Sequence, residues 1–234
     1  GDVYKRQAIY TMQEEGVDLI ELGVPFSDPA ADGPVIQRAD ERALAQGVDI
    51  FKVFELVRKI RNNVEVPMVF LLYYNVMVQY GIEKFFKRCQ ETGVDGLIIP
   101  DLPYEESDEI KEYTEKYGVY QISLVSPTSK DRIKNIAKDA KGFLYCISSL
   151  GVTGEKSSFV TNFDEFVGTI KKYTDVPACV GFGVSNGKQV KELTKYFDGA
   201  IVGSAIVKSI ATGESVEERI NNLREKIKDL KSGL

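Results

Sequence analysis

Three carboxylates mark the segment of the sequence whose residue types suit acid–base chemistry. Glu21, Asp28 and Asp32 lie within ELGVPFSDPAADGP, residues 21–34, at the end of the apolar run VDLIEL. The sequence contains no histidine, so proton transfer must use carboxylates, Tyr, Lys or Cys, and a histidine-dependent triad or zinc site is excluded. Asp28 and Asp32 also fit ordinary turns, because Ser-Asp-Pro and Asp-Gly-Pro are common turn sequences.

The alternation of side chains in VDLIEL predicts where Glu21 points. If this run is a strand, Ile20 and Leu22 share one face, and Leu19 and Glu21 share the other. Ile20 and Leu22 suit contact with covering helices, which turns Glu21 toward the interior of the fold. A buried carboxylate is costly unless it is paired, protonated or functional. We therefore predict a catalytic Glu21, with a structural ion pair as the alternative, and expect Asp32 to reach the same end of the strand.

Glycine-rich turns near the end of the sequence predict a phosphate site. GFGVS at 181–185 and VGSAIVK at 202–208 each follow a short apolar run and open a helical pattern. Glycine lets backbone N–H groups approach a ligand closely, and a helix N-terminus offers unsatisfied donors. The alternative is that these glycines only make tight turns between strand and helix. The candidate donors are Gly181, Gly183, Gly203 and Ser204.

An alternating plan of strands and helices would bring these candidate sites together. Amphipathic stretches such as 82–93 and 163–174 separate most of the apolar runs, which indicates parallel strands joined by helices. Polar and glycine-rich residues follow the strands, on the face that carries the active site in such barrels. We therefore predict an α/β fold, a (β/α)8 TIM barrel of the phosphate-binding type. The seven expected strands lie at 18–22, 67–73, 96–101, 120–125, 142–147, 177–182 and 199–203.

The strand count predicts a barrel that is incomplete at its N-terminus. A closed barrel of this class needs about eight strands, and the sequence shows seven apolar runs. Residues 1–7, GDVYKRQ, contain no alternation long enough to cross a barrel, and residues 8–16 look like the end of a helix. We expect a first strand to be missing and residues 1–7 to be non-native or a junction. No linker is visible, so residues 1–234 are expected to form a single domain.

The composition argues against several function classes. The net charge is −5 and the 30 basic residues are scattered, which argues against binding to nucleic acid or to an anionic membrane. The longest apolar stretch, 66–74, is too short to span a bilayer, and no signal peptide is visible. Cys89, Cys146 and Cys179 are isolated and lack metal-type spacing. We predict buried thiols, no metal site and a cytoplasmic location.

Taken together, these segments resemble the tryptophan synthase alpha chain family. ELGVPFSDPAADGPVIQ, residues 21–37, is the most specific match, and LLYYN, GVDGLIIPDLPYEES, LGVTGE, VGFGVS and VGSAIVK follow in the family's order. The resemblance covers about residues 8–231, and GDVYKRQ has no counterpart. It implies a lyase that cleaves indole-3-glycerol phosphate to indole and glyceraldehyde 3-phosphate. It also implies an α2β2 complex with a beta chain, in which pyridoxal phosphate belongs to the beta chain and this chain holds no cofactor.

The resemblance implies roles for individual residues. Glu21 matches the glutamate that shuttles protons, Asp32 the aspartate that holds the indole N–H, and Tyr145 the active-site tyrosine. From the residues alone, Tyr145 could equally be a packing residue. Carboxylates in different environments can perform the proton transfers of this cleavage without a histidine. The matched phosphate binders are Gly154, Gly183, Gly203 and Ser204.

The resemblance also assigns a lid and a partner interface. Thr153 matches the lid threonine that meets Asp32 on closure, and it lies in SSLGVTGEKSS, residues 148–158. Composition alone leaves this segment open between a lid and a surface loop. Asp28 matches the loop that faces the beta chain. Two alternatives stay open: another phosphate-binding barrel enzyme, such as a sugar-phosphate isomerase or epimerase, or an inactive fragment.

Overall fold

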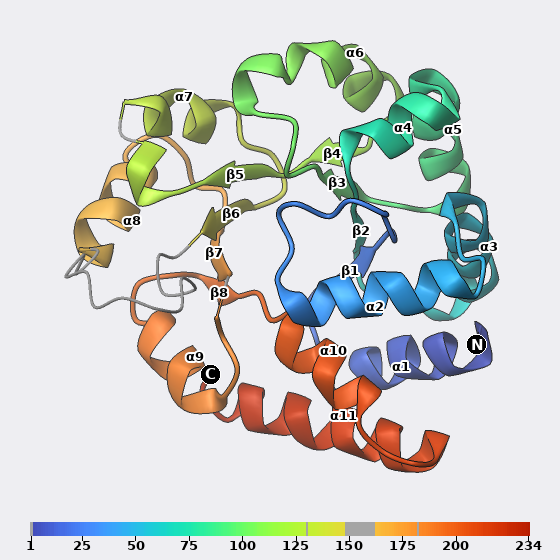
Figure 1. Cartoon of the computed structure of the whole chain (residues 1–234). Helices are drawn as coiled ribbons and strands as arrows, with labels where there is room; N and C mark the ends of the chain where they lie inside the picture. Colours follow the sequence, from blue (N-terminus) through green and yellow to red (C-terminus); the bar gives the residue numbers. More distant parts are fainter. Residues whose placement is uncertain (1, 130, 148–161, 182) are drawn as a thin grey trace. The chain divides into compact units, whose positions relative to one another are not determined.

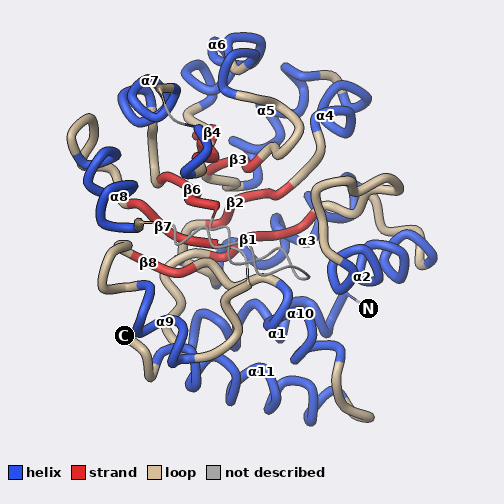
Figure 2. The backbone as a smooth tube through the Cα atoms, turned by 60° about the vertical axis from the view of Figure 1, so that its left-hand side comes forward, coloured by secondary structure: helices blue, strands red, loops and turns tan. Residues whose placement is uncertain are grey.

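The structure, a computed structural model of the chain, describes residues 2–129, 131–147, 162–181 and 183–234 (Figure 1). The chain divides into two units by its internal contacts. Unit 1 comprises Gly1–Gln121 and Val207–Glu225, and unit 2 comprises Ile122–Ile206 and Lys226–Leu234. Each unit contains one four-stranded parallel sheet, with helices between successive strands along the chain (Figure 2).

Unit 1 is built on a sheet in the order β1-β2-β3-β4. Its strands are β1 (Ile20–Gly23), β2 (Met68–Leu71), β3 (Gly96–Ile98) and β4 (Tyr120–Gln121). Ile20 lies opposite Met68 and Glu21 opposite Val69 in the parallel register. Its helices are α1 (Asp2–Glu14), α2 (Pro34–Ala45), α3 (Ile50–Ile60), α4 (Tyr74–Tyr80), α5 (Ile82–Thr92) and α6 (Asp108–Tyr117), with 3₁₀ turns at Arg61–Asn63 and Tyr104–Glu106.

The core of unit 1 forms where the apolar face of the sheet meets α3 and α5. The Asp49 side chain caps α3 by accepting the backbone N–H of Lys52 at 2.9 Å. The apolar positions of α3 then recur at helical spacing and are buried, among them Val53, Phe54 and Val57. The Phe54 ring lies 5.4 Å from those of both Phe70 on β2 and Phe85 on α5. This packing fixes the helix-facing side of β2.

Unit 2 is built on a sheet in the order β5-β6-β7-β8. Cys179 on β7 lies opposite Tyr145 on β6 and Gly199 on β8. The strands are β5 (Ser123–Val125), β6 (Leu144–Ile147), β7 (Ala178–Gly181) and β8 (Gly199–Ala200). The helices that begin in this unit are α7 (Arg132–Asp139), α8 (Phe163–Lys171), α9 (Gly187–Leu193) and α10 (Ser204–Ala211), with a 3₁₀ turn at Pro127–Ser129; α11 (Val216–Lys231) begins in unit 1 and ends in unit 2.

In two pairs of neighbouring strands, an aspartate carboxylate links the amino-terminal ends of the two strands. Asp95, just before β3, accepts the Met68 N–H and the Arg61 guanidinium on one oxygen, each at 2.8 Å. Asp198, just before β8, accepts the Ala178 N–H at 2.8 Å and is paired with an α8 lysine. Each carboxylate ties the start of one strand to the start of its neighbour, which helps to set where the opposite, carboxyl ends emerge.

The expected elements are largely confirmed. Each of the seven expected strand segments contains a strand, and residues 120–125 are divided at Ile122 into β4 and β5, so that eight strands are labelled. The helix expected at 8–16 is α1, which begins earlier, at Asp2, so residues 2–7 are helical. In the part of the chain that the structure describes, no strand precedes α1.

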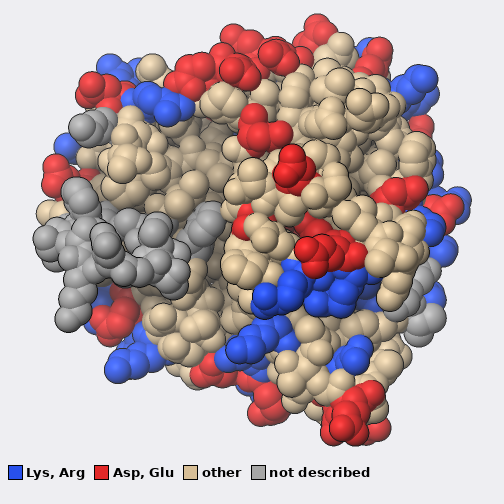
Figure 3. Space-filling model, viewed as in Figure 1, with Lys and Arg blue, Asp and Glu red and all other residues tan. Residues whose placement is uncertain are grey.

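Two properties of the structure bear on the functions that the composition argued against, namely spanning a membrane and binding to nucleic acid or an anionic membrane. No helix within the described ranges is both long and apolar enough to cross a membrane. On the face drawn in Figure 3, basic side chains near α2 lie beside acidic ones. This mixture agrees with the scattered charge of the sequence.

Candidate active site

Glu21 is the second residue of β1, on the strand face opposite the one that Ile20 and Leu22 turn to the hydrophobic core. Ile20 is buried within the core and Leu22 packs against it, so the alternation predicted for this strand is confirmed. Burial is the main factor that raises the pKa of Glu21 to about 7, and the negative charge of Asp32 also raises it. A carboxyl group whose pKa lies near neutrality can both donate and accept a proton at neutral pH. The structure brings Glu21 and Asp32 together in unit 1.

Asp32 lies in the loop after β1 and is held by Tyr73, which follows β2. The Tyr73 hydroxyl donates to Oδ2 of Asp32 at 2.9 Å and accepts the Ala31 N–H at 3.0 Å. The Phe26 ring stacks on the Tyr73 ring, with 5.0 Å between centroids. Burial raises the pKa of Asp32, and the Tyr73 hydrogen bond partly offsets that increase. Sequence reasoning assigned no role to Tyr73, although its place within LLYYN, just after the apolar run, was a signal.

Tyr145 lies on β6 against Gly181 of the neighbouring strand. A Cβ atom at Gly181 would lie 2.5 Å from Cε1 and 2.6 Å from the hydroxyl oxygen of Tyr145. The ring therefore occupies the space that any other residue at 181 would need. Gly181 was expected to donate its backbone N–H to phosphate, and that role stays a prediction. The structure shows another reason for a glycine at this position, because a side chain there would overlap the Tyr145 ring.

We predict that Gly181→Ala destabilises the protein by about 1–3 kcal/mol, because the added methyl group must displace the Tyr145 ring. Denaturant unfolding would measure the loss. Gly168→Ala on α8 is the matched control, since a Cβ there meets nothing within 4 Å, and alanine favours a helix over glycine. Adding Tyr145→Ala should make the losses less than additive. Strictly additive losses would contradict the contact.

The glycines predicted to bind phosphate follow two neighbouring strands, because β7 pairs with β8. Gly183 is exposed after β7 and has a φ of +79°, a conformation that favours glycine. Gly203 and Ser204 are exposed at the start of α10, and a Cβ at Gly203 would meet nothing within 4 Å. This helix N-terminus can therefore be approached by an anion.

The turn after β7 differs from the sequence expectation in one respect. GFGVS was expected to open a helix directly, but α9 begins later, at Gly187. The Asn186 side chain caps α9 by accepting the Gln189 N–H at 3.0 Å. Because the protein itself caps α9, the start of α10 is the better anion site of the two.

The remaining predictions concern the lid residues, Asp28, the absence of a metal site and the cysteines. Thr153 and Gly154, with the predicted lid, lie outside the described residues. Asp28 is exposed in the loop between β1 and α2, where its carbonyl accepts the Ala30 N–H at 2.9 Å, so the turn expected there is present. No group of three or more potential metal ligands occurs among the residues that were placed. Cys89 and Cys146 are buried, as predicted, whereas Cys179 is partly exposed, and none of the three forms a disulfide.

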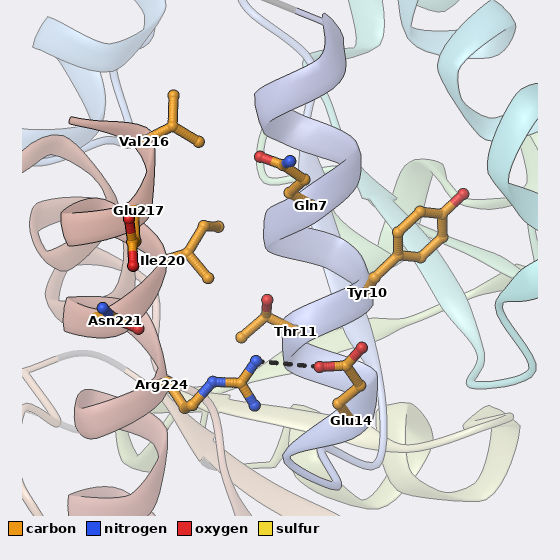
Figure 4. Close-up of a pocket in the computed structure, with 9 residues that line it drawn as sticks. All are labelled: Gln7, Tyr10, Thr11, Glu14, Val216, Glu217, Ile220, Asn221 and Arg224. Atoms are coloured by element: carbon orange, nitrogen blue, oxygen red, sulfur yellow. Dashed lines mark hydrogen bonds and ion pairs between the residues drawn. The ribbon is translucent and has the colours of Figure 1, made fainter.

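A surface groove lies between α1 and α11 within unit 1 (Figure 4). Its volume is about 550 Å³. At one end, Arg224 pairs with Glu14 at 3.1 Å. None of the residues predicted to be functional lines it. The lining residues are Gln7, Tyr10, Thr11, Glu14, Val216, Glu217, Ile220, Asn221 and Arg224.

Comparison with known proteins places these observations in a family. The model of the "Tryptophan synthase alpha chain" family matches residues 4–234, so the resemblance begins earlier than the expected residue 8. The tryptophan synthase alpha chain of Alkaliphilus metalliredigens is 47% identical over 227 residues, which are 96% of this chain and 85% of that protein.

Solved structures give the same result. The tryptophan synthase alpha subunit of Campylobacter jejuni has a TM-score of 0.84 and 40% identity, and the match covers 95% of this chain and 89% of that one. A chain of the tryptophan synthase complex from Pyrococcus furiosus has a TM-score of 0.86 and 32% identity, covering 98% and 92%. These matches confirm the predicted α/β fold of the TIM-barrel class.

Proposed function

Because the chain belongs to the tryptophan synthase alpha chain family, we propose that Glu21 carries the proton transfers of its lyase reaction and that Asp32 holds the indole N–H. That reaction cleaves indole-3-glycerol phosphate to indole and glyceraldehyde 3-phosphate, a step of tryptophan biosynthesis. The observation that supports these roles is the electrostatic coupling of the two carboxylates beside β1, where the pKa of Glu21 is about 7. Such a group exchanges protons readily at neutral pH.

The cleavage requires three changes at the substrate. Carbon C3 of the indole must gain a proton, the bond from C3 to the hydroxyl-bearing carbon must break, and that hydroxyl must lose its proton. Protonated Glu21 supplies the first proton, and its carboxylate recovers one when the hydroxyl becomes the aldehyde, so the protons balance. Asp32 accepts the indole N–H and stabilises the positive charge that C3 protonation places on the ring. A carboxylate is suited to that role because it is anionic.

The substrate phosphate is assigned to unit 2. We propose that backbone N–H groups at Gly183, Gly203 and Ser204 bind it, with Gly154 as a further donor. The open approach to the start of α10 and the positive end of that helix support this assignment. Tyr145 is proposed to contact the substrate from β6.

A beta chain is the proposed partner. The matching chain from Pyrococcus furiosus was solved as part of a tryptophan synthase complex. We propose the same association here, as an α2β2 assembly in which the exposed loop at Asp28 faces the beta chain. This chain uses no cofactor, and pyridoxal phosphate belongs to the beta chain. That none of the three cysteines forms a disulfide supports a cytoplasmic location.

Purified chain should release indole from indole-3-glycerol phosphate, and a tryptophan synthase beta chain should increase the rate. Indole can be measured colorimetrically, and the triose phosphate with a coupled dehydrogenase, in equal amounts. An isomerised sugar phosphate without indole would favour the alternative barrel enzyme. The absence of both products, with and without the beta chain, would favour an inactive fragment.

A further inference from the structure

The start of α9 packs directly against the end of α11 and the residues after it, within unit 2 (Figure 1). A Cβ atom at Gly187 would lie 2.2 Å from the carbonyl oxygen of Asp229 and 2.5 Å from the hydroxyl oxygen of Ser232. A Cβ atom at Gly233 would lie 2.1 Å from the carbonyl oxygen of Gly187. Because no side chain separates the two backbones here, the end of α11 supports the segment that leads from β7 into α9.

Side chains from both helices hold Ser185, which lies in that segment. Oε1 of Gln189, on α9, accepts the Ser185 N–H at 2.7 Å and the Ser185 hydroxyl at 3.0 Å. From α11, Nζ of Lys226 donates to the Ser185 carbonyl oxygen at 3.1 Å. The backbone N–H and the backbone carbonyl of Ser185 are therefore both bound by side chains, which restrains the chain on either side of this residue.

This restraint lies two residues from Gly183, whose N–H is assigned to the substrate phosphate. Between them, Val184 is buried. Gly183 is exposed, and as a glycine with a φ of +79° it has wide conformational freedom unless its neighbours restrain it. Donors that are already held in the bound arrangement bind a ligand more tightly, because less backbone freedom is lost on binding.

We propose that Gln189 is a positioning residue for the substrate phosphate: by holding Ser185 it keeps the Gly183 N–H directed toward the anion. The proposal rests on the role given to Gly183 above. Gln189 is exposed, so removal of its side chain leaves the Ser185 N–H to water and costs the fold little. A purely structural role therefore predicts almost no effect of this removal, whereas a positioning role predicts weaker phosphate binding.

Replacing Gln189 with methionine tests the proposal, since Gln189→Met keeps the length of the side chain and removes the acceptor oxygen. Gln90→Met is the matched control. Gln90 is an exposed glutamine of α5, in unit 1, and its Nε2 also binds the backbone, donating to the Tyr117 carbonyl oxygen at 3.1 Å. Both variants should melt within about 2 °C of the unmodified chain, as expected for exposed substitutions.

Relaxation of ¹⁵N nuclei measures the restraint without any activity measurement. In Gln189→Met the order parameters of the Gly183 and Ser185 amides should fall below about 0.6, the range of flexible backbone. Gln90→Met should leave both amides unchanged. Amides in Gln189→Met that are as ordered as in the unmodified chain would overturn the proposal.

Binding and kinetics on the full chain test the consequence for phosphate. Calorimetry should show a Kd for glycerol 3-phosphate about tenfold higher in Gln189→Met, because backbone freedom must now be lost on binding. KM for indole-3-glycerol phosphate should rise by a similar factor, with kcat retained within about threefold. An unchanged Kd in Gln189→Met would overturn the positioning role. Failure of the proposed function is recognised separately, in the unmodified chain, where the Gly183 amide signal would then not respond to glycerol 3-phosphate.

Discussion

Glu21→Gln is expected to reduce kcat for indole formation by at least about 10³-fold at pH 7, since glutamine can neither donate nor recover a proton and one positioned group contributes about 10²–10⁴-fold. Asp32→Asn should lose a similar factor, because an amide cannot supply the negative charge that the protonated indole needs. Steady-state indole release measures both losses. Binding of glycerol 3-phosphate should be retained in both variants, which separates lost chemistry from lost folding.

A control variant can exclude a general effect of removing one acidic side chain. Glu55→Gln on α3 removes the same charge from an exposed position and should leave kcat unchanged. Turnover of Glu21→Gln at the unmodified rate would contradict the assignment of Glu21. A loss of kcat in the Asp32 variant alone would mean that a group other than Glu21 performs the proton transfers.

The same Glu21 variant should be more stable than the unmodified chain at alkaline pH. The folded-state pKa of about 7 lies above the ordinary value of 4.5, so the folded protein retains a proton that the unfolded chain releases. Stability therefore falls as pH rises between these values. Because the residue is only partly buried, we expect a gain of about 1–2 kcal/mol for Glu21→Gln at pH 8. Unfolding at pH 4 and pH 8 measures the difference, which should be much smaller at pH 4.

The placement of Glu21 could be predicted because it depends on local periodicity. Side chains of a strand alternate, so the buried Ile20 and the adjacent Leu22 are sufficient to turn Glu21 to the other face. The approach of Asp32 follows from a short loop that returns to the end of its own strand. In both cases the information lies within about a dozen residues.

The contacts that hold these carboxylates could not be predicted in the same way. The hydrogen bond from Tyr73 to Asp32 joins residues 41 apart in sequence. It depends on the register that places Gly23 opposite Leu71 on the neighbouring strand. Single-sequence patterns carry no information about register between distant strands, beyond the requirement that apolar faces match.

Local turn chemistry explains the other difference. GFGVS looked like the start of a helix because its glycines resemble a phosphate-binding turn, yet Asn186 was the better signal, as an asparagine that caps the helix beginning at Gly187. A glycine at 181 could be required either for its backbone N–H donor or for its lack of a side chain, and the sequence cannot distinguish these two reasons. Only the position of the Tyr145 ring shows that the lack of a side chain matters at this position.

Gly203→Glu is expected to raise KM for indole-3-glycerol phosphate by about 100-fold while changing kcat little. The new carboxylate would stand before the N-terminus of α10, where it would compete with phosphate for the N–H donors and repel it. Hydrogen bonds to a charged group contribute about 1.5–3 kcal/mol each, so the loss of one or two accounts for this factor. The fold should tolerate the change, because a Cβ at Gly203 meets nothing within 4 Å and its φ is not in the left-handed region.

Calorimetry with glycerol 3-phosphate separates binding from catalysis in this variant. Gly168→Glu is the matched control, since it adds the same charge in unit 2 at another exposed glycine with open space around it. The control should bind glycerol 3-phosphate with unchanged Kd, whereas Gly203→Glu should bind it about 100-fold more weakly at the same melting temperature, as expected when charge-assisted hydrogen bonds are lost. If both variants bind it equally well, the phosphate site lies away from α10, and the donors must be sought elsewhere in the chain. A lower melting temperature of Gly203→Glu alone would instead mean that the glycine serves the fold, as Gly181 does beside Tyr145.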